Sequence, residues 1–380
     1  MPFFAAKPFQ TVQWRVHFDG LTMIEHLRRL FTRQQPVLPP APSGETVLVN
    51  AYCTRLQVPQ PAFAHVLHGR RDLGDAALPE HLNGFCGYVL DRGDGQMSRD
   101  KYHVILHLQR TQHHVSLDVG VGDLAALYAW AQEANAVLFT PDGHMRDPHG
   151  RILVNAMTGN ADQEASVPFP AEAWTRKAAT ETALAARGIE VAAMLPPQVS
   201  EDELVLREHA EIVGRARSLL LVALRAESVA SGEPMSVDTL LAKMPLADDH
   251  LSPDEKAFLA KDAPSAQECA PFVWRYESLQ VLEWVLGLVD ELPYPAAPCD
   301  AAATVARLIE MRDPAVRPAD QILDALDFTY RLHWHVRQMR LKKLPATGGA
   351  DADVLMERHH TLNWLVNYKY AAWDEVDTPT

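Results

Sequence analysis

The chain contains 380 residues, with 35 Lys and Arg against 49 Asp and Glu, which gives a formal net charge of −14. Hydrophobic residues make up 47% and charged residues 22%. These proportions are typical of a soluble globular protein and exclude disorder as the main state. The acidic balance also excludes binding to nucleic acid through a general basic surface. The length predicts two or three domains with enough chain to bury a core.

The four cysteines, Cys53, Cys86, Cys269 and Cys299, lie far apart and form no Cys-x-x-Cys pair. This spacing favours reduced thiols over a disulfide framework, a redox dithiol or a zinc site. The N-terminal residues lack a basic region leading into a long apolar stretch, and no apolar run approaches the roughly 20 residues of a membrane span. We therefore expect a cytoplasmic protein with no membrane contact.

Composition divides the chain near residues 160–170, a polar stretch that ends in prolines. The net charge is −2 up to Ala165 and −12 after it, and 11 of the 17 histidines lie in the first part. Such a shift is typical of a domain boundary. The predicted organisation has three parts: an N-terminal extension with a Pro-rich linker over residues 1–45, a small α+β domain over 46–165, and an all-α domain over 171–380.

The first part carries a short amphipathic helix at residues 21–31 and the linker QQPVLPPAPSGE at 34–45. Strands and helices then interleave, which predicts one sheet with helices on one face. Strands are expected at 46–53, 84–90 and 114–119, helices at 101–109 and 123–134, and a strand–turn–strand unit over 136–153 around a Pro-Asp-Gly turn. The His-rich patch from His103 to His114 has no neighbouring Cys or paired carboxylate, which favours solvated or capping histidines over metal ligands.

From residue 171 onward the pattern is helical. Capping boxes predict two helix starts, at Ser200 with Glu203 for a helix through Glu227, and at Ser252 with Glu255. Further helices are expected at 270–288, 301–312, 318–342 and 353–370, with breaks at Pro-rich and Gly-rich stretches. The fold class predicted for the whole chain is α+β, a small mixed α/β domain followed by an all-α helical domain.

The helix over 322–341 carries a polar stripe on an otherwise apolar circumference. At about 100° per residue its members share one narrow face: Asp324, Asp327, Arg331, His335 and Gln338. Neighbouring helices offer partners, and the resulting candidate polar cluster consists of Arg275, Glu277, Asp324, Asp327, Arg331, Glu357 and His360. The favoured interpretation is a structural ion-pair network, because buried charges persist only when paired. The alternative is a pocket in which these side chains perform acid–base chemistry.

The same helices contain pairs that look like metal ligands. His333 and His335 point roughly 200° apart on a helix, so they cannot hold one ion together. Glu357 and His360 have the spacing used in di-iron bundles, but the chain offers no second motif of that kind. We therefore expect neither a metal nor a cofactor, and no nucleophile, phosphate-loop or dinucleotide motif is present.

Five sequence blocks in fixed order carry a family resemblance: LSPDEKAFL, WRYE, ILDALDFTYRLHW, ERHHTLNWL and WDEVDT. Together they resemble a bacterial family defined by a domain of unknown function, and the match covers the chain from about Arg176 to the C-terminus. The region before it is similar to the N-terminal part of the longer members. The resemblance implies no activity and no residue roles.

Two classes of function follow from these observations. An acidic chain without a catalytic motif favours a non-enzymatic module of the immunity or accessory type that binds another protein with a basic surface, since complementary charge speeds association. The alternative is a hydrolase or transferase acting through the candidate polar cluster. Nucleic acid and membrane are not expected as partners.

Overall fold

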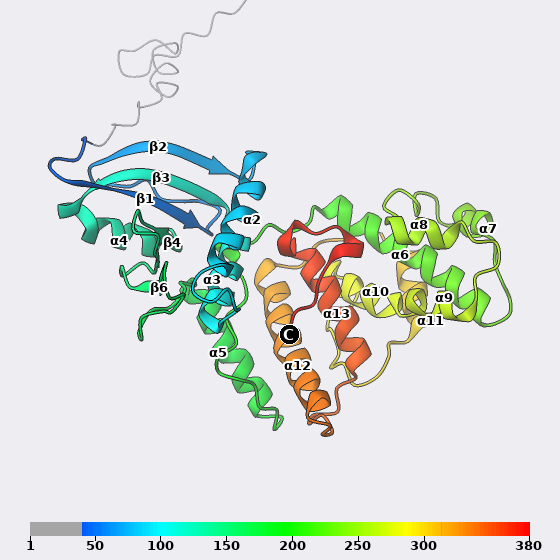
Figure 1. Cartoon of the computed structure of the whole chain (residues 1–380). Coiled ribbons are helices and arrows are strands. Elements are labelled where there is room, and N and C mark those ends of the chain that lie inside the picture. Colours follow the sequence, from blue (N-terminus) through cyan, green and yellow to red (C-terminus); the bar gives the residue numbers. More distant parts are fainter. Residues whose placement is uncertain (1–39, 313) are drawn as a thin grey trace, which may run out of the picture.

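The computed structural model describes residues 40–312 and 314–380 (Figure 1). The helix predicted at residues 21–31 and the first half of the predicted linker, residues 34–39, lie outside the described residues. From residue 46 the chain builds a mixed α/β part and then a helical part, so the predicted α+β fold class is confirmed. The division into domains at residues 160–170 stays a prediction.

The N-terminal part is built on a six-stranded antiparallel sheet with the strand order β2-β3-β1-β4-β5-β6. Strand β1 forms the centre and pairs with β3 along its full length, from Thr46 opposite Gly120 to Cys53 opposite His113. The Pro-Asp-Gly turn joins β4 to β5, as predicted. The strands are β1 (Thr46–Cys53), β2 (His65–Asp72), β3 (His113–Gly120), β4 (Ala136–Phe139), β5 (Met145–Arg146) and β6 (Ile152–Val154).

Helices cover both faces of this sheet, whereas the sequence had predicted one covered face. Alternate β1 residues explain the difference, because Val49 and Ala51 pack toward helix α4 while Tyr52 packs toward α2 and α3. The helices are α2 (Ala77–Leu90), α3 (Arg99–Gln109) and α4 (Leu124–Glu133), with the 3-10 turn η1 (Val121–Asp123) before α4.

The strand predicted at residues 84–90 is wrong, because this segment belongs to helix α2. Its glycines and aromatic residues resemble a strand, but Leu78, Leu82, Phe85 and Val89 recur at helical spacing. Val89 is buried, and Leu82 and Phe85 are partly buried against the same hydrophobic core as Tyr52. Packing of this stripe on the sheet therefore overrides the local β-propensity.

The C-terminal part is a bundle in which α12 and α13 pack against α5 and α10 (Figure 1). Its main core joins Leu219 of α6, Leu282 of α10, Leu323 of α12 and Leu362 of α13. The helices are α5 (Ala171–Ala185), α6 (His209–Ala230), α7 (Val237–Lys243), α8 (Pro253–Leu259), α9 (Ala266–Val273), α10 (Arg275–Val285), α11 (Ala301–Glu310), α12 (Ala319–Leu341) and α13 (Ala352–Leu365). Short 3-10 turns are η2 (Glu201–Glu203), η3 (Tyr368–Tyr370) and η4 (Trp373–Glu375).

The helix predicted from Ser200 through Glu227 is divided in the structure. Both capping boxes form, but the one at Ser200 closes only η2, and the chain is extended before α6 begins at His209. The cause is tertiary bonding, since the Arg207 amide donates to the Leu365 carbonyl and the Arg207 guanidinium donates to the carbonyls of Trp364 and Ala371. These bonds hold the segment before α6 against the end of α13.

Candidate functional site

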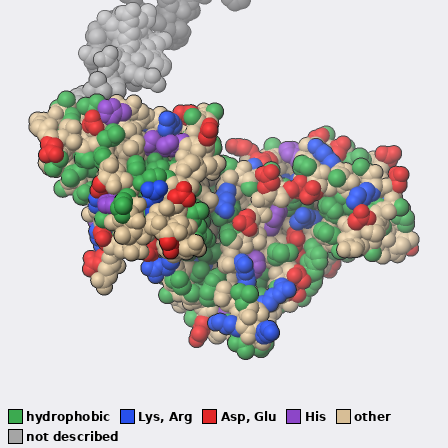
Figure 2. Space-filling view, in the orientation of Figure 1, with side chains coloured by type: hydrophobic (Ala, Val, Ile, Leu, Met, Phe, Trp, Pro, Cys, Tyr) green, Lys and Arg blue, Asp and Glu red, His purple; other side chains and the backbone are tan. Residues whose placement is uncertain are grey.

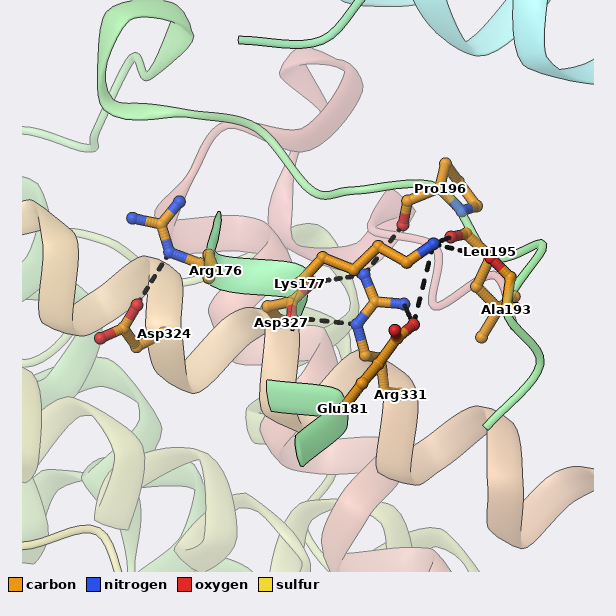
Figure 3. A network of polar contacts seen from close by, with 9 residues as sticks. All are labelled: Arg176, Lys177, Glu181, Ala193, Leu195, Pro196, Asp324, Asp327 and Arg331. Atoms are coloured by element: carbon orange, nitrogen blue, oxygen red, sulfur yellow. Dashed lines mark hydrogen bonds and ion pairs between the residues drawn. The ribbon is translucent and has the colours of Figure 1, made fainter. Parts of the chain in front are cut away.

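The Arg331 side chain forms a buried ion-pair network that joins α12 to α5 (Figure 3). It donates from Nε and Nη2 to the two carboxylate oxygens of Asp327, at 3.0 and 2.9 Å. Its Nη1 lies 3.3 Å from Oε1 of Glu181, and its Nη2 donates to the Pro196 carbonyl at 3.1 Å. The Arg331 side chain is 0% exposed and that of Asp327 is 1% exposed. This geometry is the bidentate pairing that compensates two buried charges.

Lys177 extends the network toward the segment before η2 (Figure 3). Its Nζ donates to the carbonyls of Ala193 and Leu195, at 2.7 and 2.6 Å, and lies 3.7 Å from Glu181. Burial lowers the pKa of Lys177, with the Glu181 charge acting in the opposite direction. Lys177 and Arg331 thus fix the path of residues 193–196 by bonding to its backbone.

Asp324 lies on the same helix but in a separate pair (Figure 3). Its Oδ1 accepts from Nε of Arg176 at 2.8 Å, and Arg176 also binds Glu201. The Asp324 side chain is 68% exposed, unlike that of Asp327. The predicted polar stripe therefore runs from a solvent-exposed end at Asp324 to a buried centre at Arg331.

The remaining candidates occupy other helix contacts. Glu357 of α13 accepts from Arg275 Nη1 at 2.9 Å and from Ser278 Oγ at 3.0 Å. Glu277 accepts from the Cys299 amide at 2.5 Å and lies 3.6 Å from Nη2 of Arg358. The Nε2 of His360 donates to the Trp373 carbonyl at 3.0 Å, and burial lowers the pKa of His360 to about 4.

The seven candidate residues thus form several pairs at helix contacts rather than one convergent cluster. Each of the four carboxylates already accepts a hydrogen bond from a positive side chain or a backbone amide. Glu277 and the exposed Asp324 each keep one carboxylate oxygen without a hydrogen bond, but the four carboxylates do not converge on one point as a shared acid–base site requires. This geometry supports the structural interpretation of the candidate polar cluster.

The predicted ligand pairs bind protein groups in the structure. His333 contacts His359 through their Nδ1 atoms at 3.0 Å, while His335 Nδ1 donates to the Glu190 carbonyl at 2.9 Å. Glu357 and His360 likewise have different partners. Within residues 40–312 and 314–380, no three His, Cys, Asp or Glu side chains gather as a metal would require.

The prediction of solvated or capping histidines is wrong for His107 and His114, which are buried in the packing of the sheet part. His107 Nε2 donates to the Tyr52 carbonyl at 2.9 Å, and burial lowers the pKa of His107 to about 3. His114 lies 3.2 Å from Arg71 and 3.0 Å from the Asn50 side chain, and burial lowers its pKa to about 4. Both rings are therefore neutral at pH 7 and connect β1 to its neighbours.

A pocket at the contact between the two parts of the chain was not predicted from the sequence. Its volume is about 80 Å³, and its walls come from α3, the segment 196–199, α12, α13 and the residues after α13. Aromatic and aliphatic side chains form most of the walls, with a few amides and charged groups among them. Such a lining is typical of small-molecule sites. The pocket therefore joins the candidate polar cluster as a candidate functional site.

One wall of this pocket has an unusual backbone. Asn367, Lys369 and Tyr370 adopt left-handed conformations with φ of 52°, 55° and 54°. Each such residue costs roughly 1–2 kcal/mol unless it is glycine, although Asn tolerates the conformation better. Two long-range bonds hold the segment: Asn367 Nδ2 donates to the Val205 carbonyl at 2.8 Å, and the Tyr370 hydroxyl donates to Gln112 Oε1 at 2.9 Å. The fold thus maintains a strained backbone at the pocket.

A second buried pair crosses the contact beside the pocket. Arg110, directly after α3, donates to Oε1 of Glu203 in η2 at 2.9 Å, and Glu203 is 3% exposed. The Ser200 amide and the Asn135 side chain also donate to this carboxylate. The Arg110 guanidinium stacks on the Phe169 ring at 4.4 Å. Both parts of the chain therefore contribute buried, compensated charges to the same site.

These observations define the chain as a mixed α+β protein whose helical part contains buried ion pairs and forms a pocket where it meets the antiparallel sheet part. None of the helices in the described part combines the length and apolar character needed to cross a membrane. A family model described as a domain of unknown function (DUF4272) matches residues 176–376, and the chain belongs to this family. No match was found among curated proteins or among solved structures. The matched range holds all seven candidate residues and the α12, α13 and η3 walls of the pocket, while α3 precedes it.

Proposed function

We propose that this protein is a non-enzymatic binding module, of the immunity or accessory type, and that its partner is another protein with a basic surface. The arrangement of the candidate carboxylates supports binding over catalysis, because they lie in separate pairs at different helix contacts rather than around one point. The proposed contact is the loop between α7 and α8. The observation that carries the proposal is Leu246 in that loop, which has an exposed side chain and a strained backbone conformation.

Leu246 has a φ of 71° and is 58% exposed. A leucine in this conformation costs roughly 1–2 kcal/mol, and glycine would avoid that cost. The loop is nevertheless held in place, because Ala247 is fully buried and its carbonyl accepts from Ser218 Oγ of α6 at 2.7 Å. A rigid loop that presents an apolar side chain to solvent at an energetic cost is suited to fill a pocket on a partner.

Negative charge surrounds this apolar side chain. Asp248 and Asp249 follow Leu246, both are exposed, and neither forms an ion pair within the described residues. Acidic side chains are visible on the α6–α9 lobe in Figure 2. Between residues 209 and 273 the exposed acids are Glu227, Glu233, Asp238, Asp248, Asp249, Asp254, Asp262 and Glu268, against Arg217, Lys243, Lys256 and Lys261. An apolar anchor with an acidic rim favours a basic partner surface.

The proposal is tested by comparing three immobilised variants with the parent chain. Leu246→Gly removes the apolar side chain and relieves the backbone strain, and the double substitution Asp248→Asn with Asp249→Asn removes charge at constant size. The matched control is Lys343→Gly, which relieves the same strain at another exposed residue, with a φ of 57°. Proteins captured from a lysate of the source organism are identified for each variant.

We expect the parent and Lys343→Gly to capture the same protein of high isoelectric point, and Leu246→Gly to lose it. With that protein purified, the double Asn variant should slow association and weaken its salt dependence, since rim charges act on the association rate. Melting temperatures of Leu246→Gly and Lys343→Gly should equal or exceed that of the parent. Capture that is unchanged in Leu246→Gly, or a partner with an acidic contact surface, would contradict the proposal.

A further inference from the structure

We propose that β2 accepts residues 11–18 of the same chain as a further antiparallel strand, along the side of β2 that faces away from β3. This inference goes beyond the proposed protein binding and does not depend on it, because β2 and the α7–α8 loop share no residue. It rests on four observations: the open edge of β2, an apolar side chain exposed there, the sequence pattern of residues 11–18, and the place where the chain enters the sheet.

Strand β2 has a neighbouring strand on one side only. It comes first in the strand order β2-β3-β1-β4-β5-β6, and Figure 1 shows it along the border of the sheet. Among the described residues, the backbone of residues 66–71 forms hydrogen bonds only with β3. Every second residue of an edge strand turns its N–H and C=O groups away from the sheet, and such a row of groups can pair with another strand.

Leu67 shows where apolar surface is left uncovered at this edge. It lies opposite Leu117 of β3, so the two side chains point to the same face of the sheet. Leu117 is fully buried in the core between the sheet and α4, whereas Leu67 is 54% exposed. One more strand beyond β2, with apolar side chains on this face, would therefore cover Leu67 and extend the core.

The chain carries a segment of this kind ahead of the sheet. Residues 11–18, which lie outside the described residues, read TVQWRVHF and alternate strictly between polar and apolar side chains. Such alternation of β-branched and aromatic residues predicts a strand with one apolar face, and the Asp-Gly pair that follows is typical of a turn. The apolar side chains are Val12, Trp14, Val16 and Phe18.

The chain enters the sheet at the end where β2 begins. Thr46 of β1 lies opposite Gly120, and His65 of β2 lies opposite Val119, so both strands begin beside the same end of β3. A strand beyond β2 is three strand spacings from β1, which is about 15 Å. Residues 19–39 can span up to about 70 Å when extended, so they are long enough to connect the added strand to β1.

The neighbouring strands and the connection to β1 select the direction and the occupant. All neighbouring strands in this sheet are antiparallel, and a strand antiparallel to β2 ends beside His65, which places Phe18 near the entry point at Thr46. A tethered segment has an effective concentration of about millimolar, so it outcompetes the β2 edge of a second copy at micromolar protein. Residues 11–18 are therefore favoured over a second chain.

Hydrogen exchange of the full chain at single-residue resolution tests the pairing. The test variant carries Arg15→Pro together with Val16→Pro. Neighbouring residues of a strand point their amides in opposite directions, so one of the two prolines removes a donor to β2 in any register. The matched control carries Gln34→Pro together with Gln35→Pro, which are two adjacent prolines in the linker.

We expect slow exchange at all β2 amides in the parent and in the linker control. In the test variant, the β2 amides that face away from β3 should exchange about tenfold faster or more, while the amides of β1 and β3 keep their rates. Fast exchange of these outward-facing amides in the parent would overturn the proposal, and so would equal rates in the parent and the test variant.

A photo-crosslinking amino acid in place of Trp14 identifies the neighbour of the added strand. We expect cross-links to residues 65–72 within one chain, with a yield that does not depend on protein concentration. Cross-links to β2 of a second copy, recognised by a doubled mass, would show that the edge pairs between chains and would contradict the proposal. Cross-links confined to other segments would contradict it as well.

Discussion

Replacing Arg331 with Met tests whether the buried network of α12 stabilises the fold. The substitution keeps a long apolar side chain but leaves the Asp327 carboxylate, 1% exposed, without its bidentate partner. The bonds from Arg331 to Glu181 and to the Pro196 carbonyl are lost as well. Removing one member of a buried pair typically costs about 3–5 kcal/mol, a large share of the 5–15 kcal/mol that stabilises an ordinary domain.

The measurement is urea unfolding followed by circular dichroism, with the midpoint and the slope fitted separately. Arg337→Met is the matched control on the same helix, because Arg337 is exposed and binds only the C-terminal Thr380 in the described chain, so its loss should cost under about 1 kcal/mol. In the double variant Asp327→Leu with Arg331→Met an apolar pair replaces both charges, and most of the lost stability should return.

The result that would refute this reasoning is a loss of less than about 1 kcal/mol in Arg331→Met at an unchanged slope. Asp327 would then have to be solvated or protonated at little cost, which a side chain buried to this degree does not allow. A double variant as unstable as Arg331→Met would instead show that the Pro196 and Glu181 bonds, rather than the uncompensated charge, carry the effect.

Three further predictions concern the other candidate residues and the domain division. Glu357→Gln should lower the free energy of unfolding by about 2 kcal/mol, because Arg275 loses its charged acceptor. Asp324→Asn should lower it by under about 1 kcal/mol, because Asp324 is exposed. Thermal melts of the two variants check this order, and a melting temperature above that of the parent in either variant would favour a functional site there. Chelator should leave the melting temperature unchanged, and a drop restored by one divalent ion would contradict this. A fragment that begins at Ala171 should stay helical and unfold cooperatively but melt lower than the whole chain, because Glu203 loses Arg110; a fragment unfolded by circular dichroism would show one shared core.

The candidate polar cluster shows which contacts can be predicted from the local sequence pattern and which cannot. Helical spacing predicted that Asp327 and Arg331 share one face, and in the structure they pair because residues four apart on a helix are neighbours. Their further partner Glu181 lies in α5, 150 residues away from Arg331, and no pattern in the sequence connects the two. Helical periodicity likewise placed Asp324 on the stripe but could not show that its side chain remains exposed.

The pocket could not be predicted for the same reason. Its walls come from segments between Tyr102 and Pro379, so it exists only once α3 and the residues around Phe169 lie against α12 and α13. The strained segment after α13 contains no glycine, and only Asn367 carries a recognisable preference for the left-handed conformation. The left-handed backbone at Lys369 and Tyr370 is imposed by long-range bonds such as that of Tyr370 to Gln112, which local propensity does not encode.

The histidines make stability depend on pH below about 6.5, and the upper part of this range lies above the pH at which most carboxylates titrate. Burial is the main cause that lowers the pKa of five of them, to about 3 for two and about 4 for three: His107, His359, His114, His333 and His360. In the unfolded chain each returns to its usual pKa of about 6.5. Below that value the unfolded state binds more protons than the folded state, so stability is fully present above pH 6.5 and is lost as the pH falls toward 4.

Each such histidine contributes at most about 1.4 kcal/mol per pH unit between its folded and unfolded pKa, so the five act in the same direction on stability as the pH falls. Melting temperatures between pH 4.5 and 8 should therefore be level above pH 7 and fall steeply below 6.5. His360→Gln isolates one contribution, because the Gln amide can still donate to the Trp373 carbonyl while it cannot titrate. The melting temperature of this variant should fall less steeply with decreasing pH than that of the parent, because one titrating histidine is missing. A melting temperature that stays level down to pH 5 would mean that these rings gain protons within the folded state, and hence that they are accessible to solvent rather than held neutral by burial.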